Sequence, residues 1–117
     1  MIYDFSGVPH APKWSVPRLF PPRLFPVQED VEVIRAIRSA VGSSVAIMVD
    51  YNQCLKPSEA VQRLRLLDDE GLTWVEEPTL AHDYAGHALI ARETKTPIQC
   101  GENWWGTLDM RIGGILS

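Results

Sequence analysis

The sequence predicts an α/β fold made of consecutive βα units around a parallel sheet. Between residues 29 and 100, short apolar runs alternate with amphipathic stretches of helical period, and short loops separate them. Strand, helix, strand, helix, strand in this order is typical of right-handed βαβ units. An acidic residue also follows each apolar run at the same interval, which indicates that the units are equivalent. Three strands alone leave two open edges, so the pattern predicts a segment of a larger α/β body.

The first regular element expected is a helix that starts near Asp30. Asp30 is a suitable N-cap, because its side chain can accept a hydrogen bond from a backbone N–H of the first turn. Val33, Ile37 and Val41 then fall on one face at helical spacing. Gly42 follows the last apolar position, where helices commonly end. The pattern therefore predicts a helix that begins at Asp30 and ends at Gly42.

Three strands, with two helices between them, are expected after this first helix. Residues 45–50, VAIMVD, are continuously apolar up to the final acid, which predicts a strand that is buried on both faces. Residues 72–76 and 97–100 are the next two strands expected. The segment 57–71 begins with a proline and ends with a glycine, which is typical of a helix. Residues 84–94 have a weaker apolar pattern and are also expected to be helical.

The first 28 residues differ from the rest of the chain. Six of the nine prolines fall between Pro9 and Pro26, and the sequence PRLFP occurs twice in tandem. Proline removes a backbone donor and restricts the backbone, so a helix or a central strand is excluded at this density. We therefore expect an irregular proline-rich segment, residues 1–28, and a domain, residues 29–117. An extended arm, a ligand for an SH3-like partner and the product of a damaged reading frame all remain open.

The composition is that of a soluble globular protein. The 117 residues are 45% hydrophobic and 22% charged, with a net charge of -4. No basic surface for nucleic acid or an anionic membrane is expected at this charge. The longest apolar run, residues 45–49, is far too short to cross a bilayer, and the start lacks the features of a signal peptide. A cytoplasmic protein with reduced thiols at Cys54 and Cys100 is therefore expected.

Three acids, Asp50, Glu76 and Glu102, close the three predicted strands at intervals of 26 residues. The carboxyl ends of parallel strands are where α/β folds build their sites, and neighbouring strands lie about 4.8 Å apart. Three converging carboxylates repel one another unless a cation lies between them. Oxygen ligands, few in number, favour Mg²⁺ over Ca²⁺. Each acid could instead simply cap its strand or face solvent, but the equal spacing favours a metal site.

Four motifs carry a resemblance to a known family. VDYNQ (residues 49–53), TWVEEPT (73–79), HDYAGH (82–87) and GENWWG (101–106) resemble the mandelate racemase and muconate lactonizing enzyme group of the enolase superfamily. HDYAGH after EEPT is most similar to the mandelate racemase branch. The resemblance implies a partial TIM-type (β/α)7β barrel, with about three consecutive units that correspond to strands 3–5 of the C-terminal barrel domain.

The resemblance also implies a site and a chemistry. Asp50, Glu76 and Glu102 match the ligands of a Mg²⁺ ion, and Asn52 matches a position against substrate and metal. The reaction implied is α-proton abstraction from a 2-hydroxy carboxylate such as mandelate, with stabilisation of the enediolate. An acid-sugar dehydratase is the alternative, and full-length relatives are expected to be homo-oligomers. Glu77 is expected to support the site without binding the metal, because its side chain points away from that of Glu76 if the strand is still extended there.

The chain departs from the family where the catalytic bases are expected. The family's Lys-x-Lys motif is missing: Leu19 and Pro21 fall near its two expected lysine positions, and Lys13 is the only lysine before Asp50. The strand that carries the family's catalytic histidine lies beyond the sequence. His82 and His87 are expected to have packing or surface roles, so no catalytic residue is assigned. These departures predict that the chain as written is inactive, and a non-catalytic, decayed gene product is the competing interpretation.

The last residues leave two interpretations open. RIGG, residues 111–114, resembles a family segment that follows the sixth strand. Either about one βα unit is deleted and Asp109 stands at the position of the family's dyad aspartate, or Asp109 belongs to an ordinary helix start. Without barrel closure, open edges and apolar faces predict a chain that is unstable or aggregates.

Overall fold

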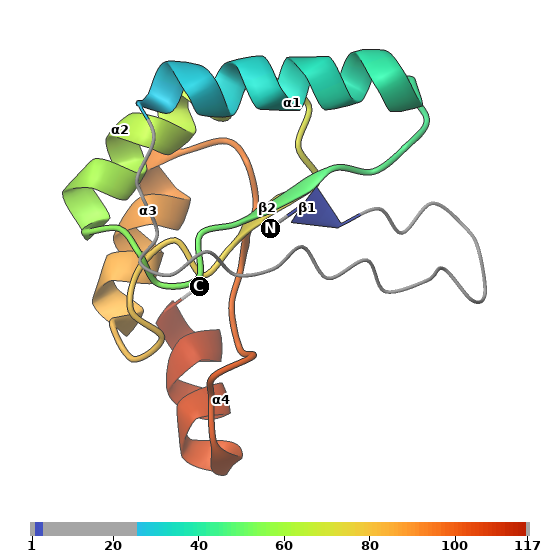
Figure 1. Cartoon of the computed structure of the whole chain (residues 1–117). Coiled ribbons are helices and arrows are strands. Elements are labelled where there is room, and N and C mark those ends of the chain that lie inside the picture. Colours follow the sequence, from blue (N-terminus) through green and yellow to red (C-terminus); the bar gives the residue numbers. More distant parts are fainter. Residues whose placement is uncertain (1, 4–25, 117) are drawn as a thin grey trace.

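The computed structural model describes residues 2–3 and 26–116, which form a four-stranded sheet and four helices (Figure 1). The elements in chain order are β1 (Ile2–Tyr3), α1 (Val27–Val41), β2 (Met48–Asp50), α2 (Pro57–Leu67), β3 (Trp74–Glu76), α3 (Tyr84–Glu93), β4 (Ile98–Gln99) and α4 (Gly106–Leu116). Most of the proline-rich segment, including both PRLFP repeats except Pro26, lies outside the described residues. The boundary between residues 28 and 29 therefore stays a prediction.

The parallel sheet predicted from the sequence is present. Strands β2, β3 and β4 are parallel and adjacent, with Val49 opposite Val75 and Val75 opposite Ile98. The strand β1, which the sequence did not indicate, pairs with β2 in the antiparallel direction. The expectation of two open edges is therefore wrong at β2, because β1 covers that edge. Beyond β4, no further strand pairs with the sheet among the described residues.

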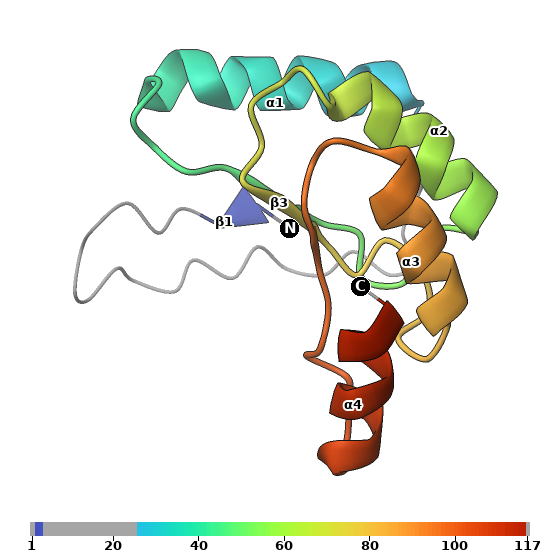
Figure 2. The ribbon, with the colours of Figure 1, turned by 180° about the vertical axis from the view of Figure 1, so that it is seen from behind.

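The helices pack in chain order along the sheet. Helices α1, α2 and α3 follow one another on one side, and α4 lies at the end of the molecule opposite α1 (Figures 1 and 2). Leu64 of α2, Val75 of β3 and Ile90 of α3 are fully buried and form the centre of the core between helices and sheet. Burying each such side chain contributes about 1.5–3 kcal/mol. None of the helices in the described part is long and apolar enough to span a membrane.

Helix α1 starts earlier than predicted. It begins immediately after Pro26, which has a φ of -49° and is suited to the start of a helix, and it ends at Gly42 as expected, with a φ of 87°. Asp30 is therefore not the N-cap but lies in the first turn. Its carboxylate accepts hydrogen bonds from the Tyr51 hydroxyl and from Nη1 of Arg63, each at 2.8 Å. The residue that looked like a cap instead ties α1 to α2 and to the end of β2.

The first central strand is shorter and less buried than predicted. Only the second half of the expected strand 45–50 pairs as β2, and Val45 and Val49 are half-buried. The backbone carbonyl of Val45 accepts a hydrogen bond from the Arg38 guanidinium, which also donates to Gly42. These hydrogen bonds anchor the segment before β2 to α1.

Candidate metal centre

Asp50 and Glu76 are the last residues of two neighbouring parallel strands, and they are direct register partners. Residues opposite each other in parallel strands point to the same face of the sheet, so both carboxylates lie at one edge on one face. Asp50 is 9% exposed, and its Oδ1 accepts a hydrogen bond from the backbone N–H of Asn52 at 2.7 Å. The sequence interval correctly predicted that these two acids occupy equivalent places.

Glu102 lies in the loop that follows β4. The loop turns at Gly101, whose φ of 126° is in the region that favours glycine. The pKa of Glu76 is raised, first because the side chain is partly buried, and then by the negative charges of Asp50 and Glu102. All three predicted acids are thus near enough to interact electrostatically at the carboxyl end of the sheet.

The donor chemistry of this group suits a hard cation, because carboxylate oxygens are the ligands that Mg²⁺ prefers. The side chains are not closed around a common point, however. Within the described residues, no three His, Cys, Asp or Glu side chains are grouped tightly enough to hold a metal ion. Glu102 is exposed and Glu76 is half-buried, so both have room to change rotamer. The arrangement brings three carboxylates to one end of the sheet without joining them in a coordination shell.

Glu77 connects the loops that surround these acids. Its side chain is 1% exposed, and its carboxylate accepts hydrogen bonds from Asn103 Nδ2 at 2.7 Å and from the Asn103 backbone N–H at 3.4 Å. Its backbone N–H donates to Gln99, and its carbonyl accepts from Gln53. The strand is no longer extended here, since Glu77 has a φ of 37°. The condition of the alternation argument, an extended strand at Glu77, is therefore not met, and the contacts of Glu77 agree with a supporting role.

Asn103 is the partner that sequence reasoning missed. Glu77 and Asn103 are separated by 26 residues, the same interval that separates Glu76 from Glu102. The interval of 26 residues therefore relates two adjacent pairs. One pair is the two carboxylates Glu76 and Glu102, and the other is the hydrogen-bonded pair Glu77 and Asn103. This second use of the repeat was the signal that could have identified Asn103, which holds the loop next to Glu102.

Two further hydrogen bonds fix the loop between β3 and α3. Oε1 of Gln53 accepts from the backbone N–H of Ala81 at 2.9 Å, and the Trp104 indole donates to the carbonyl of Ala81 at 2.8 Å. The loops after β2 and β4 thus hold the loop between them from both sides. Asn52, predicted to contact substrate, has a φ of 48° and orients Asp50 through its backbone N–H. A role for its side chain stays a prediction.

His82 lies in the loop before α3, His87 lies within α3, and Asp109 lies in α4. His82 is exposed and its Nδ1 is 3.5 Å from the Tyr84 hydroxyl, whereas His87 is buried with Nδ1 3.1 Å from the carbonyl of Asp83. Both placements agree with packing or surface roles. Asp109 lies in the first turn of α4 and accepts hydrogen bonds from the Trp105 backbone N–H and the Tyr84 hydroxyl. These bonds lower the pKa of Asp109, and its position is that of a helix start.

Curated relatives match the part of the chain that carries these motifs. The chain is 39% identical over 74 residues to an L-talarate/galactarate dehydratase of Salmonella typhimurium, a match that covers 63% of the chain and 19% of that enzyme. It is 37% identical over 86 residues to an N-succinyl-L-Arg/Lys racemase of Bacillus cereus, which covers 73% of the chain and 23% of the racemase. The chain therefore spans about a fifth of the length of these relatives, whose activities differ.

A solved structure supports the same relationship. A Bradyrhizobium enolase crystallised with magnesium and mandelic acid superposes with a TM-score of 0.76 at 35% identity, covering 80% of this chain and 26% of that one. The family model described as Enolase C-terminal domain-like matches residues 9–112. The three parallel βα units correspond to part of the barrel domain of these proteins. The chain belongs to the Enolase C-terminal domain-like family of the enolase superfamily.

Proposed function

We propose that Asp50, Glu76 and Glu102 bind Mg²⁺ and that the bound ion recruits a small carboxylate. The observation that supports this most strongly is geometric: Asp50 and Glu76 are register partners at the ends of β2 and β3, and Glu102 lies in the loop after β4. Such a group is costly without a cation, because each carboxylate disfavours ionisation of the others. In this proposal Glu77 and Asn103 hold the Glu102 loop against the end of β3, so that binding of the ion requires new side-chain rotamers of Glu76 and Glu102 but no movement of the loop.

The carboxylate that we propose is a 2-hydroxy acid such as mandelate, with Asn52 against it. A relative of the same family was crystallised with magnesium and mandelic acid, which supports this choice. Bound Mg²⁺ supplies charge neutralisation for a substrate carboxylate whose α-carbon loses a proton. The chain's own residues contribute ligands at three strand ends and a fixed loop geometry.

We further propose that this chain binds without turnover. Proton transfer at an α-carbon needs a base within hydrogen-bonding reach of that proton. Neither of the two histidines in the described part of the chain is placed for this role: His87 of α3 is buried with one ring nitrogen next to the Asp83 carbonyl, and His82 is exposed. The chain is therefore the metal-holding part of a racemase-type site, and the 117-residue polypeptide is proposed to be inactive.

Titration of Mg²⁺ into the chain by calorimetry tests the metal site. We expect saturable binding that Glu76→Gln weakens at least tenfold, because the substitution removes one charged ligand while keeping the shape of the side chain. Glu32→Gln is the matched control, since Glu32 is exposed on α1 and away from the strand ends. Equal affinity in the two variants would contradict the assignment.

Turnover is tested separately. The chain is incubated with Mg²⁺ and mandelate in deuterated water, and NMR measures the deuterium content at the α-carbon of mandelate. We expect no deuterium to be incorporated there. Measurable exchange would show that the chain has a base that we have not assigned.

The dehydratase relative favours a second candidate, binding of a sugar diacid. This candidate rests on the 39% identity to the L-talarate/galactarate dehydratase. Competition of galactarate against mandelate in the presence of Mg²⁺ separates the two. Tighter binding of galactarate would favour an acid-sugar dehydratase origin.

A further inference from the structure

The indole of Trp74 carries a buried hydrogen-bond donor that has no partner. Trp74 as a whole is half-buried, but its Nε1 atom is fully buried and donates to no described residue. A buried N–H without a partner costs free energy, and such groups are rare in folded proteins. The indole of Trp104, in contrast, donates to the carbonyl of Ala81 at 2.8 Å. The donor of Trp74 is therefore available to an acceptor that comes within reach of it.

Trp74 lies on the same face of the sheet as the proposed metal ligands. Trp74 and Glu76 are the first and last residues of β3, and Val75 between them packs into the core. Because side chains alternate along a strand, Trp74 and Glu76 both point to the face opposite Val75. Asp50 is the register partner of Glu76, so it points to this face as well. The indole is therefore the neighbour of Glu76 along the strand, on the face where the acids converge.

The indole N–H is close enough to Glu76 to act on its carboxylate. Burial and the charges of Asp50 and Glu102 raise the pKa of Glu76, and the Trp74 side chain opposes this rise as a hydrogen-bond donor. No hydrogen bond of ordinary geometry joins the two groups, however. The donor and the carboxylate are thus neighbours that are not aligned. Glu76 is half-buried and has room to change rotamer, which can bring one of its oxygens onto the indole N–H.

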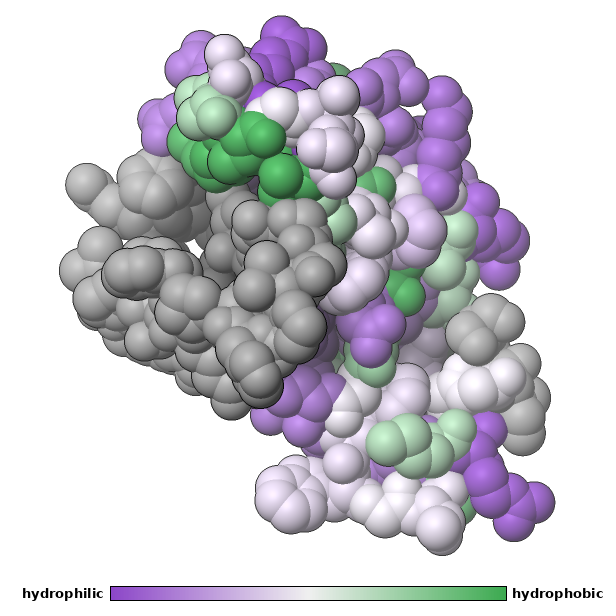
Figure 3. Space-filling model, turned by 90° about the vertical axis from the view of Figure 1, so that its right-hand side faces the viewer, coloured by the Kyte–Doolittle hydropathy of each residue, from purple (hydrophilic) through white to green (hydrophobic). Residues whose placement is uncertain are grey.

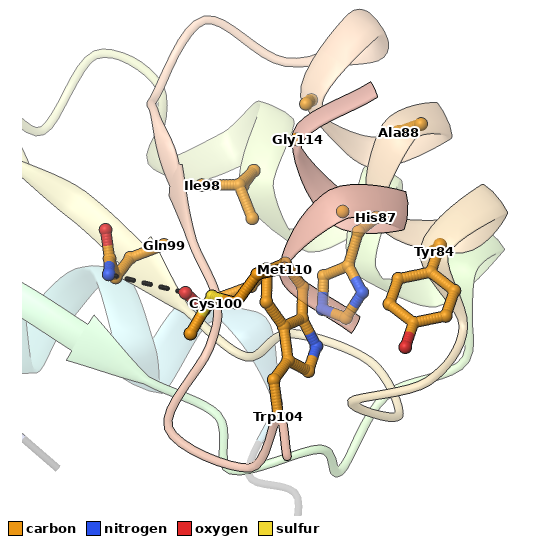
Figure 4. Close-up of a pocket in the computed structure, with 11 residues that line it drawn as sticks. Tyr84, His87, Ala88, Ile98, Gln99, Cys100, Trp104, Met110 and Gly114 are labelled. Atoms are coloured by element: carbon orange, nitrogen blue, oxygen red, sulfur yellow. Dashed lines mark hydrogen bonds between the residues drawn. The ribbon is translucent and has the colours of Figure 1, made fainter. Parts of the chain in front are cut away.

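Gln99 is the other uncharged polar side chain next to Glu76. It is the register partner of Glu76 on β4, so its amide points to the same face. Figure 4 shows Ile98 on the side of β4 where His87 and Trp104 lie, and the Gln99 amide on the other side. Its Nε2 is 3.5 Å from the carbonyl of Cys100, and the side chain is exposed, so water satisfies the amide. A hydrogen bond to Glu76 therefore benefits the buried donor of Trp74 more than the solvated amide of Gln99.

We infer that Trp74 is a positioning residue for Glu76: its indole N–H holds one oxygen of the Glu76 carboxylate while the other oxygen binds the metal ion. A carboxylate accepts at both oxygens, so the two contacts are compatible. The contact supplies a partner to a buried donor and fixes a side chain that otherwise has several rotamers. Hydrogen bonds to metal ligands orient those ligands and contribute to metal affinity. The inference rests on the proposed Mg²⁺ site.

NMR of the chain with ¹⁵N-labelled tryptophan observes the donor directly. The indole N–H signal of Trp74 is assigned through the backbone resonances of the same residue, and Mg²⁺ alone is then added. We expect the indole proton of Trp74 to move downfield as the hydrogen bond forms, and to saturate together with binding of the ion. The indole of Trp104 is the internal control, because it is already paired with Ala81 and should not move. A purely structural Trp74 would leave its own signal unchanged.

Calorimetric titration of Mg²⁺ measures what the contact contributes to affinity. We expect Trp74→Phe to weaken binding about tenfold, because the variant keeps an aromatic ring and removes the donor. Gln99→Leu is the matched control, since it removes the amide on the neighbouring strand and keeps a side chain of similar size. Its affinity for Mg²⁺ should equal that of the unsubstituted chain.

The outcomes separate this inference from the proposed function. If the unsubstituted chain does not bind Mg²⁺ saturably, the metal site fails and the positioning role falls with it. If the ion binds and the Trp74 indole does not shift, the metal site stands and the positioning role is overturned. The same holds if Trp74→Phe binds as tightly as the unsubstituted chain, or no more weakly than Gln99→Leu. Should Trp74→Phe fail to fold, the indole shift in the unsubstituted chain decides alone.

Discussion

At the scale of single residues, the Glu77–Asn103 pair shows how a buried charge is made tolerable. A carboxylate that is 1% exposed requires hydrogen bonds, and Asn103 supplies two of them, from its side chain and its backbone. The same pair fixes the loop that carries Glu102. The interaction therefore links the stability of the fold to the geometry of the proposed metal centre.

Asn103→Ala is expected to lower the free energy of unfolding by about 1–3 kcal/mol, because Glu77 is left buried with one side-chain hydrogen bond fewer. Mg²⁺ affinity should fall as well, since the loop beside Glu102 loses its anchor. Urea denaturation measures the first effect and calorimetry the second. Adding Glu77→Gln to Asn103→Ala should cost less than the sum of the two single changes, whereas strict additivity would contradict direct coupling.

The buried histidine predicts a pH effect on stability. Burial lowers the pKa of His87 in the folded chain below its ordinary value of 6.5, although the Asp83 carbonyl and the charges of Asp83 and Glu77 oppose the shift. As pH falls through about 6.5, the unfolded chain takes up the proton first, so folding loses stability. Urea denaturation at several pH values should show that His87→Phe removes part of this loss. His82→Phe should keep the wild-type dependence, and identical curves for wild type and His87→Phe would contradict the shift.

At the scale of elements, each strand is only two or three residues long, and the loops after the strands continue the hydrogen bonding between neighbouring segments. Backbone hydrogen bonds continue past the strand ends: Tyr51 donates to the carbonyl of Glu76, and Leu55 donates to that of Pro78. Helix α3 is anchored in the same region, because its N-cap Asp83 accepts a hydrogen bond from the backbone N–H of Gly86. Loops and helix starts therefore act together as one layer above the sheet.

Gly86→Ala is expected to disrupt the start of α3. A Cβ at this position would collide with the Asp83 carboxylate and lie 2.8 Å from Pro57 of α2. We expect thermal or urea unfolding to show a loss of about 1–3 kcal/mol, from the lost cap and the overpacking. Gly114→Ala is the matched control, since a Cβ there meets nothing within 4 Å. That control should be neutral or slightly stabilising, because alanine favours helix over glycine.

At the scale of the whole molecule, apolar surface is exposed at both ends. On the face shown in Figure 3, strongly hydrophobic residues gather toward the end where α1 lies, next to hydrophilic residues. At the other end, Trp105 is 84% exposed, and Leu108 and Met110 of α4 are 68% and 56% exposed. Exposed apolar groups of this kind promote association.

We expect the 13.1 kDa chain to self-associate. Sedimentation velocity over a range of concentrations measures this behaviour. The double change Trp105→Ser and Leu108→Ser should reduce association, because it removes apolar surface from the α4 end. A wild-type chain that stays monomeric over the whole concentration range would sink this prediction.

The sequence by itself determined the order of the parallel units and the equivalence of Asp50 and Glu76. It could do so because apolar periodicity and strand-end acids are local properties that recur with each βα unit. The same local patterns located α1, α2 and α3 to within a few residues, whereas α4 was not predicted. Asp30 was the exception, because an acid near a helix start resembles a cap whether or not the helix already began at Pro26.

Only the tertiary structure decided how these local features are used. It paired β1 with β2, joined Glu77 to Asn103, and left the buried indole N–H of Trp74 without a hydrogen-bond partner among the described residues. Each of these outcomes depends on contacts between segments far apart in the chain, and a local pattern does not encode which buried polar group finds a partner. The physical reason is that buried polar groups need hydrogen-bond partners, while the path of the chain decides which partners lie within reach.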